Sequence, residues 1–210
     1  TEILKIWYND TVQNTNRTVY YYRIDLEPPV LKDITPKNNS AIQTGHKLNI
    51  KLEDAGPGSG SGLDTVIVSN GTHNKTRKSK EFEIGPEWNS EGLKYLKVWK
   101  NDTLSNQNMT EFRYNVDNTP PETTDNITWK GWKNSNISVK LETTDNNEPS
   151  FIYSCIFEKT SMNSCKPLPT GKPNLTKELG CPEGETCIRV LSYYSNDTAG
   201  NSETKKSLDN

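Results

Sequence analysis

Apolar residues are scarce in this chain of 210 residues. Ala, Val, Ile, Leu, Met, Phe, Trp, Tyr and Cys make up 30%, whereas roughly 45–50% is usual for globular domains when glycine is included. This composition excludes one large core and favours several small sandwiches with a high surface-to-volume ratio. Disorder also goes with low hydrophobicity, but 5 Trp, 9 Tyr, 4 Phe and a net charge of only −2 argue against it.

Long apolar runs and an excess of one charge are absent too. No run approaches the roughly 20 residues that span a bilayer, and a net charge of −2 gives no electrostatic reason to bind nucleic acid. No signal peptide is visible at Thr1. If the protein is secreted, we expect that its signal was removed or that these residues come from inside a longer chain.

The motifs of common enzymes are missing. The chain contains no GxSxG, P-loop, HExxH or GxGxxG pattern. The Gly-rich stretch GPGSGSG at 56–62 precedes a predicted strand, so the helix N-terminus of a phosphate site is lacking; we interpret it as a loop. His46 and His73 are single and polar-flanked, and pairs among 27 acidic residues arise by chance. We therefore predict no enzyme activity, no catalytic residue and no cofactor.

Sequons for N-glycosylation are abundant. About five N-x-S/T sites are expected by chance from 24 Asn residues, yet eleven occur, nine of them with Thr. A sequon marks a surface position in an exported protein. The predicted acceptors are Asn9, Asn16, Asn38, Asn70, Asn74, Asn101, Asn108, Asn126, Asn136, Asn174 and Asn196.

All four cysteines lie in the last third of the chain, at Cys155, Cys165, Cys181 and Cys187. Three pairings are open, and we favour the local pairs, 155 with 165 and 181 with 187. Zinc is disfavoured because gaps of nine and five residues do not fit C-x₂₋₄-C spacing and no His lies nearby. Disulfides and sequons both indicate a compartment outside the reducing cytosol.

An internal repeat dominates the sequence. LKIWYNDT at 4–11 returns as LKVWKNDT at 96–103, and IDLEPP at 24–29 returns as VDNTPP at 116–121, both 92 positions later. A third NDT begins at Asn196, 95 positions after the second. We predict a repeat with a period of about 92 residues, which is the right length for a seven-stranded sandwich.

Alternation of apolar and polar residues predicts short strands. No sustained helical period occurs, so the predicted fold class is all-β, a series of tandem immunoglobulin-like β-sandwich repeats. Asp54 and Asp145 are expected to end two of the strands. The predicted strands lie at about 3–8, 18–24, 30–34, 47–56, 63–68, 80–84, 93–99, 111–116 and 136–145.

Two Pro-Pro pairs mark the predicted domain boundaries, because proline cannot continue a strand ladder. Residues 1–26 would be the last two strands of one repeat, 27–118 a complete repeat and 119–210 a complete repeat with two disulfides. A lone hairpin over 1–26 would be marginal in water and would leave open edges. We expect it to be completed either by further strands of the same polypeptide or by a neighbouring subunit through strand addition.

Aspartates gather at the repeat junctions, at Asp10, Asp25, Asp102, Asp117 and Asp197. Calcium binding would suit such carboxylates. An Asx-turn, in which the Asp of each Asn-Asp-Thr accepts backbone hydrogen bonds, is the interpretation we favour, so no metal site is predicted.

The tryptophans offer a second kind of candidate site. Trp7 and Trp99 recur at the repeat offset in alternating strands, and we expect a core or inter-sheet role for both. Trp88, Trp129 and Trp132 fall in loops or strand starts, where they could serve glycan recognition.

A family resemblance follows from DNTPPETTDNITWKGWKNSN at 117–136 and SNDTAGNSE at 195–203. The D-N-T-P-P, W-x-N-S-N and S-x-D-x-A-G-N elements, with a cysteine two residues after Tyr153, resemble the immunoglobulin-like repeats of archaeal and bacterial cell-surface proteins. The resemblance is strong over 117–210 and weaker over 1–116, where cysteines are lacking and the 56–62 insert is present. It implies a spacer, filament, surface-layer or stalk role, and the sequon load looks archaeal.

The predicted function is that of a structural, non-catalytic protein at the cell surface or outside the cell. Its expected partners are neighbouring repeats or copies of itself in an extended assembly, with no nucleic acid and no membrane-spanning segment. An adhesin, or another module that binds glycan or protein, is the alternative. Sequons in every part of the chain favour the structural role, because dense glycans would cover the sides of the domains.

Overall fold

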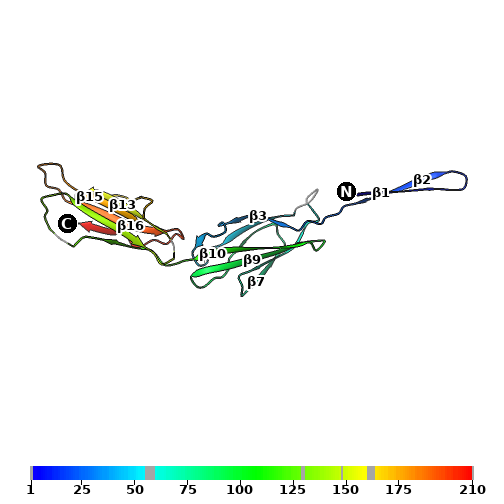
Figure 1. Cartoon of the computed structure of the whole chain (residues 1–210), viewed down its shortest axis with the longest axis horizontal. Coiled ribbons are helices and arrows are strands. Elements are labelled where there is room, and N and C mark those ends of the chain that lie inside the picture. Colours follow the sequence, from blue (N-terminus) through cyan, green and yellow to red (C-terminus); the bar gives the residue numbers. More distant parts are fainter. Residues whose placement is uncertain (1, 55–59, 129–130, 148, 160–163, 210) are drawn as a thin grey trace. The chain divides into compact units, whose positions relative to one another are not determined.

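The structure is a computed structural model that describes residues 2–54, 60–128, 131–147, 149–159 and 164–209. All regular elements of this part are β-strands (Figure 1), so the all-β prediction is confirmed. None of the described residues forms a helix that is long and apolar enough to span a bilayer. Most of the Gly-rich stretch 56–62 lies outside the described residues, as does Trp129.

The chain begins with a two-stranded antiparallel hairpin, β1 (Glu2–Asn9) and β2 (Thr15–Tyr22), drawn in blue in Figure 1. Its side chains have the same alternation as a sandwich strand pair, but both faces are exposed. Leu4 is 47% exposed and Ile6 43%, whereas Leu96 and Val98, 92 positions later, are fully buried. The open edges and exposed apolar face expected for residues 1–26 are thus present.

Strands β3 to β10 form two sheets, which we call the first sandwich. One sheet has the order β3-β5-β8, and the other has the order β4-β10-β9-β6-β7. Strand β5 pairs antiparallel with β3 and β8, and β6 pairs antiparallel with β7 and β9, whereas β4 pairs parallel with β10. The strands are β3 (Val30–Thr35), β4 (Ala41–Ile42), β5 (Leu48–Glu53), β6 (Leu63–Ser69), β7 (Asn74–Arg77), β8 (Glu81–Ile84), β9 (Gly92–Asp102) and β10 (Gln107–Val116).

Alternation in β5 and β9 builds the core of the first sandwich. In β5, Leu48 and Ile50 are fully buried and the residues between them are exposed. Every second residue of β9 is buried from Leu96 onward, ending with Asp102. Because each fully buried Leu, Ile or Val side chain stabilises the fold by about 1.5–3 kcal/mol, a few alternating positions hold each small sandwich together.

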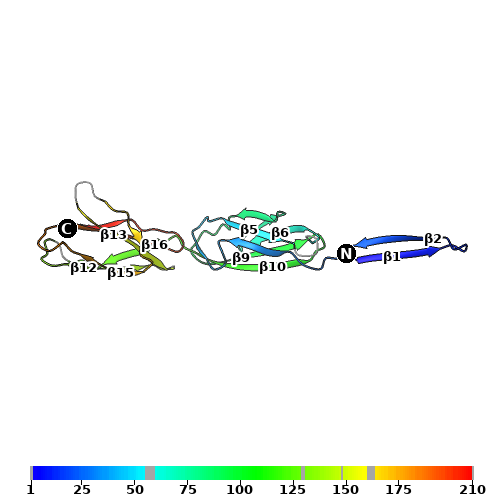
Figure 2. The same cartoon turned by 90° about the horizontal axis from the view of Figure 1, so that it is seen from above.

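Strands β11 to β17 form the second sandwich, also from two sheets, ordered β11-β12-β15 and β14-β13-β16-β17. Figure 2 shows β12 beside β15 and β13 beside β16, as their antiparallel registers require. The strands are β11 (Glu122–Asp125), β12 (Ile137–Thr144), β13 (Ser150–Glu158), β14 (Leu168–Pro169), β15 (Asn174–Leu179), β16 (Arg189–Asp197) and β17 (Lys206–Asp209).

The core of the second sandwich is partly polar. Its apolar cluster is Val139, Leu141, Ile152, Leu179, Leu191 and Tyr193. Beside it, the Thr143 hydroxyl donates to Ser195 Oγ over 2.9 Å, and the Thr123 hydroxyl lies 2.8 Å from the same oxygen. The Glu203 carboxylate accepts from Ser195 N over 2.9 Å and lies 2.9 Å from Lys206 Nζ. Burial by itself would raise the pKa of Glu203, but hydrogen bonds led by the Thr123 side chain outweigh it and lower that pKa.

Two disulfides close the local loops of the second sandwich, Cys155–Cys165 and Cys181–Cys187. This is the local pairing favoured from the sequence. The first bridge starts in β13, and the second lies between β15 and β16. Neither bridge crosses from one sheet to the other, so the bridges constrain loops rather than the core.

The chain divides into two compact units. The first comprises residues 1–36, 48–84 and 96–111, and the second comprises residues 37–47, 85–95 and 112–210. The period of about 92 residues and the domain boundaries at 26/27 and 118/119 remain predictions from the sequence.

The expectation of a core or inter-sheet role for Trp7 and Trp99 is wrong. In β9, Leu96, Val98 and every second residue after them point into the core. Trp99 lies between these positions, so it points outward and is 39% exposed. Trp7 is 65% exposed, with the Arg17 guanidinium 5.4 Å from its ring centre. Of the tryptophans that the structure describes, Trp88 is the buried one; it is a loop residue whose ring centre lies 5.8 Å from that of Tyr114.

The β1–β2 hairpin should exchange its amide hydrogens much faster than β9–β10, although the two pairs share a sequence pattern. A two-stranded sheet without a covered face is marginal in water, and opening free energies near zero give little protection. Hydrogen exchange measured by mass spectrometry on the whole chain tests this. Equal protection of both pairs would show that the hairpin face is covered, for instance by a second copy of the chain.

Reduction of the disulfides should destabilise the second sandwich and leave the first unchanged. Loops of this size constrain the unfolded chain by about 2–3 kcal/mol each in the entropic treatment. Urea unfolding with and without reductant, followed by hydrogen exchange in β9 and β16, separates the two sandwiches. Stoichiometric zinc, or four free thiols in native material, would contradict the pairing.

Candidate metal centres

Each Asn-Asp-Thr segment forms a tight hairpin turn closed by its aspartate. The Asp102 Oδ1 atom accepts from Leu104 N over 2.9 Å and from Asn106 N over 2.8 Å. Asp10 makes the same two bonds to Val12 N and Asn14 N, at 2.9 Å each. Asp197 accepts from Gly200 N and Asn201 N at 2.7 and 2.8 Å. These are the Asx-type turns that the sequence predicts.

An asparagine four residues after each aspartate completes the turn. Asn106 Nδ2 donates to Asp102 Oδ2 over 2.7 Å and to the Asp25 carbonyl over 3.1 Å. Asn201 Nδ2 makes the same pair of bonds, to Asp197 Oδ2 over 2.7 Å and to the Asp117 carbonyl over 3.1 Å. These asparagines are not among the residues predicted from the sequence, although Asn14, Asn106 and Asn201 each stand four positions after the aspartate of an Asn-Asp-Thr segment.

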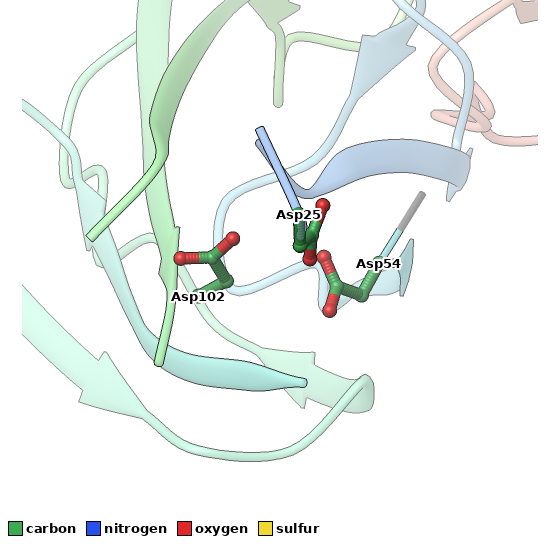
Figure 3. A group of neighbouring side chains, drawn as sticks. All are labelled: Asp25, Asp54 and Asp102. Atoms are coloured by element: carbon green, nitrogen blue, oxygen red, sulfur yellow. The ribbon is translucent and has the colours of Figure 1, made fainter. Parts of the chain in front are cut away.

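Three carboxylates converge in the first unit, those of Asp25, Asp54 and Asp102, which we call the first cluster (Figure 3). One oxygen from each lies within 4.8 Å of the others. Asp54 follows the end of β5 and Asp102 is the last residue of β9, so both strands finish at the same pole of the sandwich. Asp25 comes from the segment between β2 and β3.

Backbone amides hold the first cluster. Ser61 N donates to Asp25 Oδ2, and Gly62 N donates to Asp54 Oδ2. Gly62 has a φ of +100°, in the left-handed region that glycine adopts without steric cost. The turn at Gly62 thus presents successive amides to two of the carboxylates.

The second cluster repeats this arrangement in the second unit, with Asp117, Asp145 and Asp197. One oxygen of each again lies within 4.8 Å of the others. Asp145 follows the end of β12 and Asp197 ends β16. In the sequence, Asp117 lies 92 positions after Asp25, and Asp145 lies 91 positions after Asp54.

Burial leaves carboxylate oxygens in both clusters without a hydrogen-bond donor. Asp54 is 3% exposed and its Oδ1 has no partner; Asp117 is fully buried and its Oδ2 has none. Burial raises the pKa of Asp117, and the charges of Asp145 and Asp197 raise it further, whereas the Thr119 amide, which donates to Oδ1, and the nearby Asn147 side chain oppose this rise. Burial also opposes ionisation of Asp102, but hydrogen bonds led by the Asn106 side chain outweigh it and lower that pKa.

The structure thus brings together four of the five junction aspartates singled out from the sequence, two in each cluster. Asp10, the fifth, is exposed and belongs to neither cluster. Asp54 and Asp145, predicted only as strand ends, supply the third carboxylates. Carboxylate oxygens at this spacing form a donor set suited to a hard divalent cation.

The sequon asparagines lie at the surface. None of the eleven is buried. Three are partly exposed: Asn70, Asn101 and Asn196. The exposed eight are Asn9, Asn16, Asn38, Asn74, Asn108, Asn126, Asn136 and Asn174. His46 and His73 are exposed as well, and His73 N donates to Asn70 Oδ1 over 2.7 Å.

Comparisons with known proteins bear on the fold. No family model and no curated protein sequence matches the chain. Three N-terminal domains of the bacteriophage RB49 highly immunogenic outer capsid protein are similar in structure, with a TM-score of 0.53 and 11% identity over 98% of this chain and 73% of that one. Fibronectin(III)-like modules of Clostridium thermocellum CbhA give a TM-score of 0.51 and 12% identity, covering 86% and 92%. The fold is thus of the immunoglobulin and fibronectin III-like kind.

Asn201→Ala should destabilise the second sandwich by about 2–4 kcal/mol, because it removes donors from two acceptors in a buried site. It also removes the acceptor of Gln43 Nε2, 2.8 Å away. Asn14→Ala is the matched control, since Asn14 makes the corresponding bond to Asp10 at an exposed hairpin; its effect should stay within about 0.5 kcal/mol. Urea unfolding of the whole chain measures both, because the hairpin amides exchange too fast to report a change. If Asn201→Ala and Asn14→Ala lowered stability equally, the asparagine would stabilise only the hairpin turn and not the contact with the preceding segment.

Proposed function

We propose that the protein is a non-catalytic structural component of the cell surface, built from tandem sandwiches that carry N-linked glycans. A filament, a surface layer or a stalk would each use such a string. The observation that carries the proposal is the exposure of the sequons: eight of the eleven acceptors are exposed and none is buried. Its expected partners are neighbouring repeats or copies of itself.

The acceptor geometry supports glycan attachment. N-linked sugar is joined to Nδ2 of asparagine, and several sequon residues use only Oδ1 in the fold. Asn38 Oδ1 accepts from Arg113 N over 2.7 Å, and Asn126 Oδ1 accepts from Lys140 N over 2.8 Å. These bonds fix the side chain while leaving the amide nitrogen for the sugar.

The disulfides support an extracellular location. Disulfides persist in oxidising compartments and are rare in the cytosol, and the structure joins all four cysteines. Glycans and disulfides would arise along the same export route, so both features favour one location.

Sequons also surround a groove on the outer face of the first sandwich. The groove has a volume of about 1000 Å³ and contains Trp99 and Met109. Asn74, Asn101 and Asn108, all sequon residues, line it as well. Sugars on these residues would cover the apolar floor, which favours a coat over an open binding surface.

An adhesin remains the second candidate, favoured by one feature of the second sandwich. Trp132 is 78% exposed and lines a groove of about 540 Å³ together with Arg189 and Glu183. An exposed indole beside charged groups suits stacking on a sugar ring. Trp132→Ala would abolish binding to immobilised glycans if this role holds, and would leave assembly unchanged.

Mass spectrometry of native protein should find sugar on most of the eleven sequons. Asn196 should be the least occupied, because it is only partly exposed and its Oδ1 is buried. The exposed Asn89 lies outside any sequon and serves as the unmodified control. Fewer than about three occupied sites would contradict the surface-coat proposal.

Electron microscopy of the native cell surface tests the structural role itself. A regular filament or lattice containing the chain is the expected result. Isolated molecules that bind glycans through Trp132 would instead support the adhesin.

A further inference from the structure

We propose that each three-aspartate cluster binds one calcium ion. The first site would use Asp25, Asp54 and Asp102, and the second Asp117, Asp145 and Asp197. The spacing of the donor oxygens, within 4.8 Å of one another, lets a single ion contact one oxygen of each residue. This goes beyond the proposed structural role, which needs no metal.

The unpartnered buried oxygens are the evidence that the clusters need a ligand. A buried carboxylate oxygen without a donor costs free energy, and Asp54 Oδ1 and Asp117 Oδ2 are such atoms. Both belong to side chains that are at least nine-tenths buried, and in Figure 3 the Asp54 carboxylate turns toward Asp25. Within the described part of the chain, no lysine or arginine pairs with Asp54 or Asp117. A bound cation would balance the negative charge of these carboxylates and would also coordinate their unpartnered oxygens.

The hairpin turn alone does not account for this arrangement. Asp10 closes the same turn with the same bonds, although it is exposed and belongs to neither of the clusters found among the described residues. The turn therefore explains the positions of Asp102 and Asp197. It gives no reason for Asp54 or Asp117 to bring a further buried carboxylate beside them.

Two copies of one arrangement argue against chance proximity. In both, a strand-end aspartate, a hairpin aspartate and an aspartate of the preceding segment come together. In both, the hairpin asparagine donates to the backbone carbonyl of that preceding segment. Asn106 thus positions Asp25, and Asn201 positions Asp117, although neither asparagine would bind the ion itself.

The donor set favours calcium over magnesium. Calcium binds oxygen at about 2.3–2.6 Å and accepts irregular sets of carboxylates and waters, whereas magnesium requires near-octahedral geometry at about 2.0–2.1 Å. Three carboxylates from three separate segments suit the larger and less demanding ion.

Calcium titration of the chelator-treated chain, by calorimetry, tests the proposal. We expect two ions per chain. Asp54→Asn and Asp117→Asn should each remove one of them, and Asp10→Asn, the control with the same turn, should retain both. If Asp54→Asn does not fold, Asp25→Asn replaces it, because Asp25 lies between strands. Magnesium binding as tight as calcium would overturn the choice of metal.

Thermal unfolding distinguishes a ligand role from a structural one. Calcium at about 100 times its Kd should raise the Tm of the wild-type chain by at least about 4 °C, and each variant should lose the rise for its own sandwich. In chelator alone the wild-type sandwiches should stay folded on their own cores, and the variants should be no less stable. The proposal would be overturned if calcium gave neither a heat of binding nor a rise in Tm, or if both variants still bound two calcium ions per chain. Variants that are equally destabilised with and without calcium would overturn it as well.

Discussion

In each of the two sandwiches, the aspartate of the Asn-Asp-Thr hairpin turn organises one pole. Asp102 satisfies the turn amides with one oxygen and fixes Asn106 with the other. Asn106 then binds the carbonyl of Asp25, which belongs to the incoming segment. A single side chain thus links the end of β9 to the point where the chain enters the sandwich, and Asp197 does the same in the second copy.

A chain with few apolar residues can fold this way because each sandwich needs only a small core. In the second sandwich, the apolar cluster of six buried residues is supplemented by hydroxyl groups that bond to one another. Glu203 anchors these hydroxyls, and Lys206 balances its charge. Buried polar groups are tolerated when each group of the network has a hydrogen-bond partner. Serine and threonine can therefore occupy positions in this core that apolar side chains usually fill.

Alternation predicted β3, β5, β6, β8, β9 and β10 from the sequence, because half-buried strands leave a period of two. It failed for β13 and β16, because Ser154 and Ser195 stand at buried positions on these strands and because β16 is buried on both sides from 190 to 193. The prediction for Trp99 failed because it was based on residue type rather than on strand register. Its size suggested the core, but register places it on the outer face, since a strand shows opposite sides at successive residues.

The aspartates of the candidate metal centres likewise fall into those that the sequence predicted as junction residues and those that it did not. Repetition identified Asp25, Asp102, Asp117 and Asp197, because the junction motifs recur in the sequence. Asp54 and Asp145 were seen only as the ends of strands. Which strand ends share a pole depends on the sheet pairing, and a single sequence does not reveal that pairing for a sandwich.

The parallel pairing of β4 with β10 bears on how the first sandwich would respond to mechanical load. Asn115 N donates to the Ser40 carbonyl over 3.1 Å, and Asp117 N donates to the Ile42 carbonyl over 2.9 Å. The chain enters the sandwich at β3, reaches β4 after a further five residues and leaves the sandwich directly after β10. Once tension along the polypeptide has released β3, it would slide the parallel strands β4 and β10 past each other and load their hydrogen bonds together, in shear. Bonds that must break together resist pulling better than bonds that peel apart one at a time.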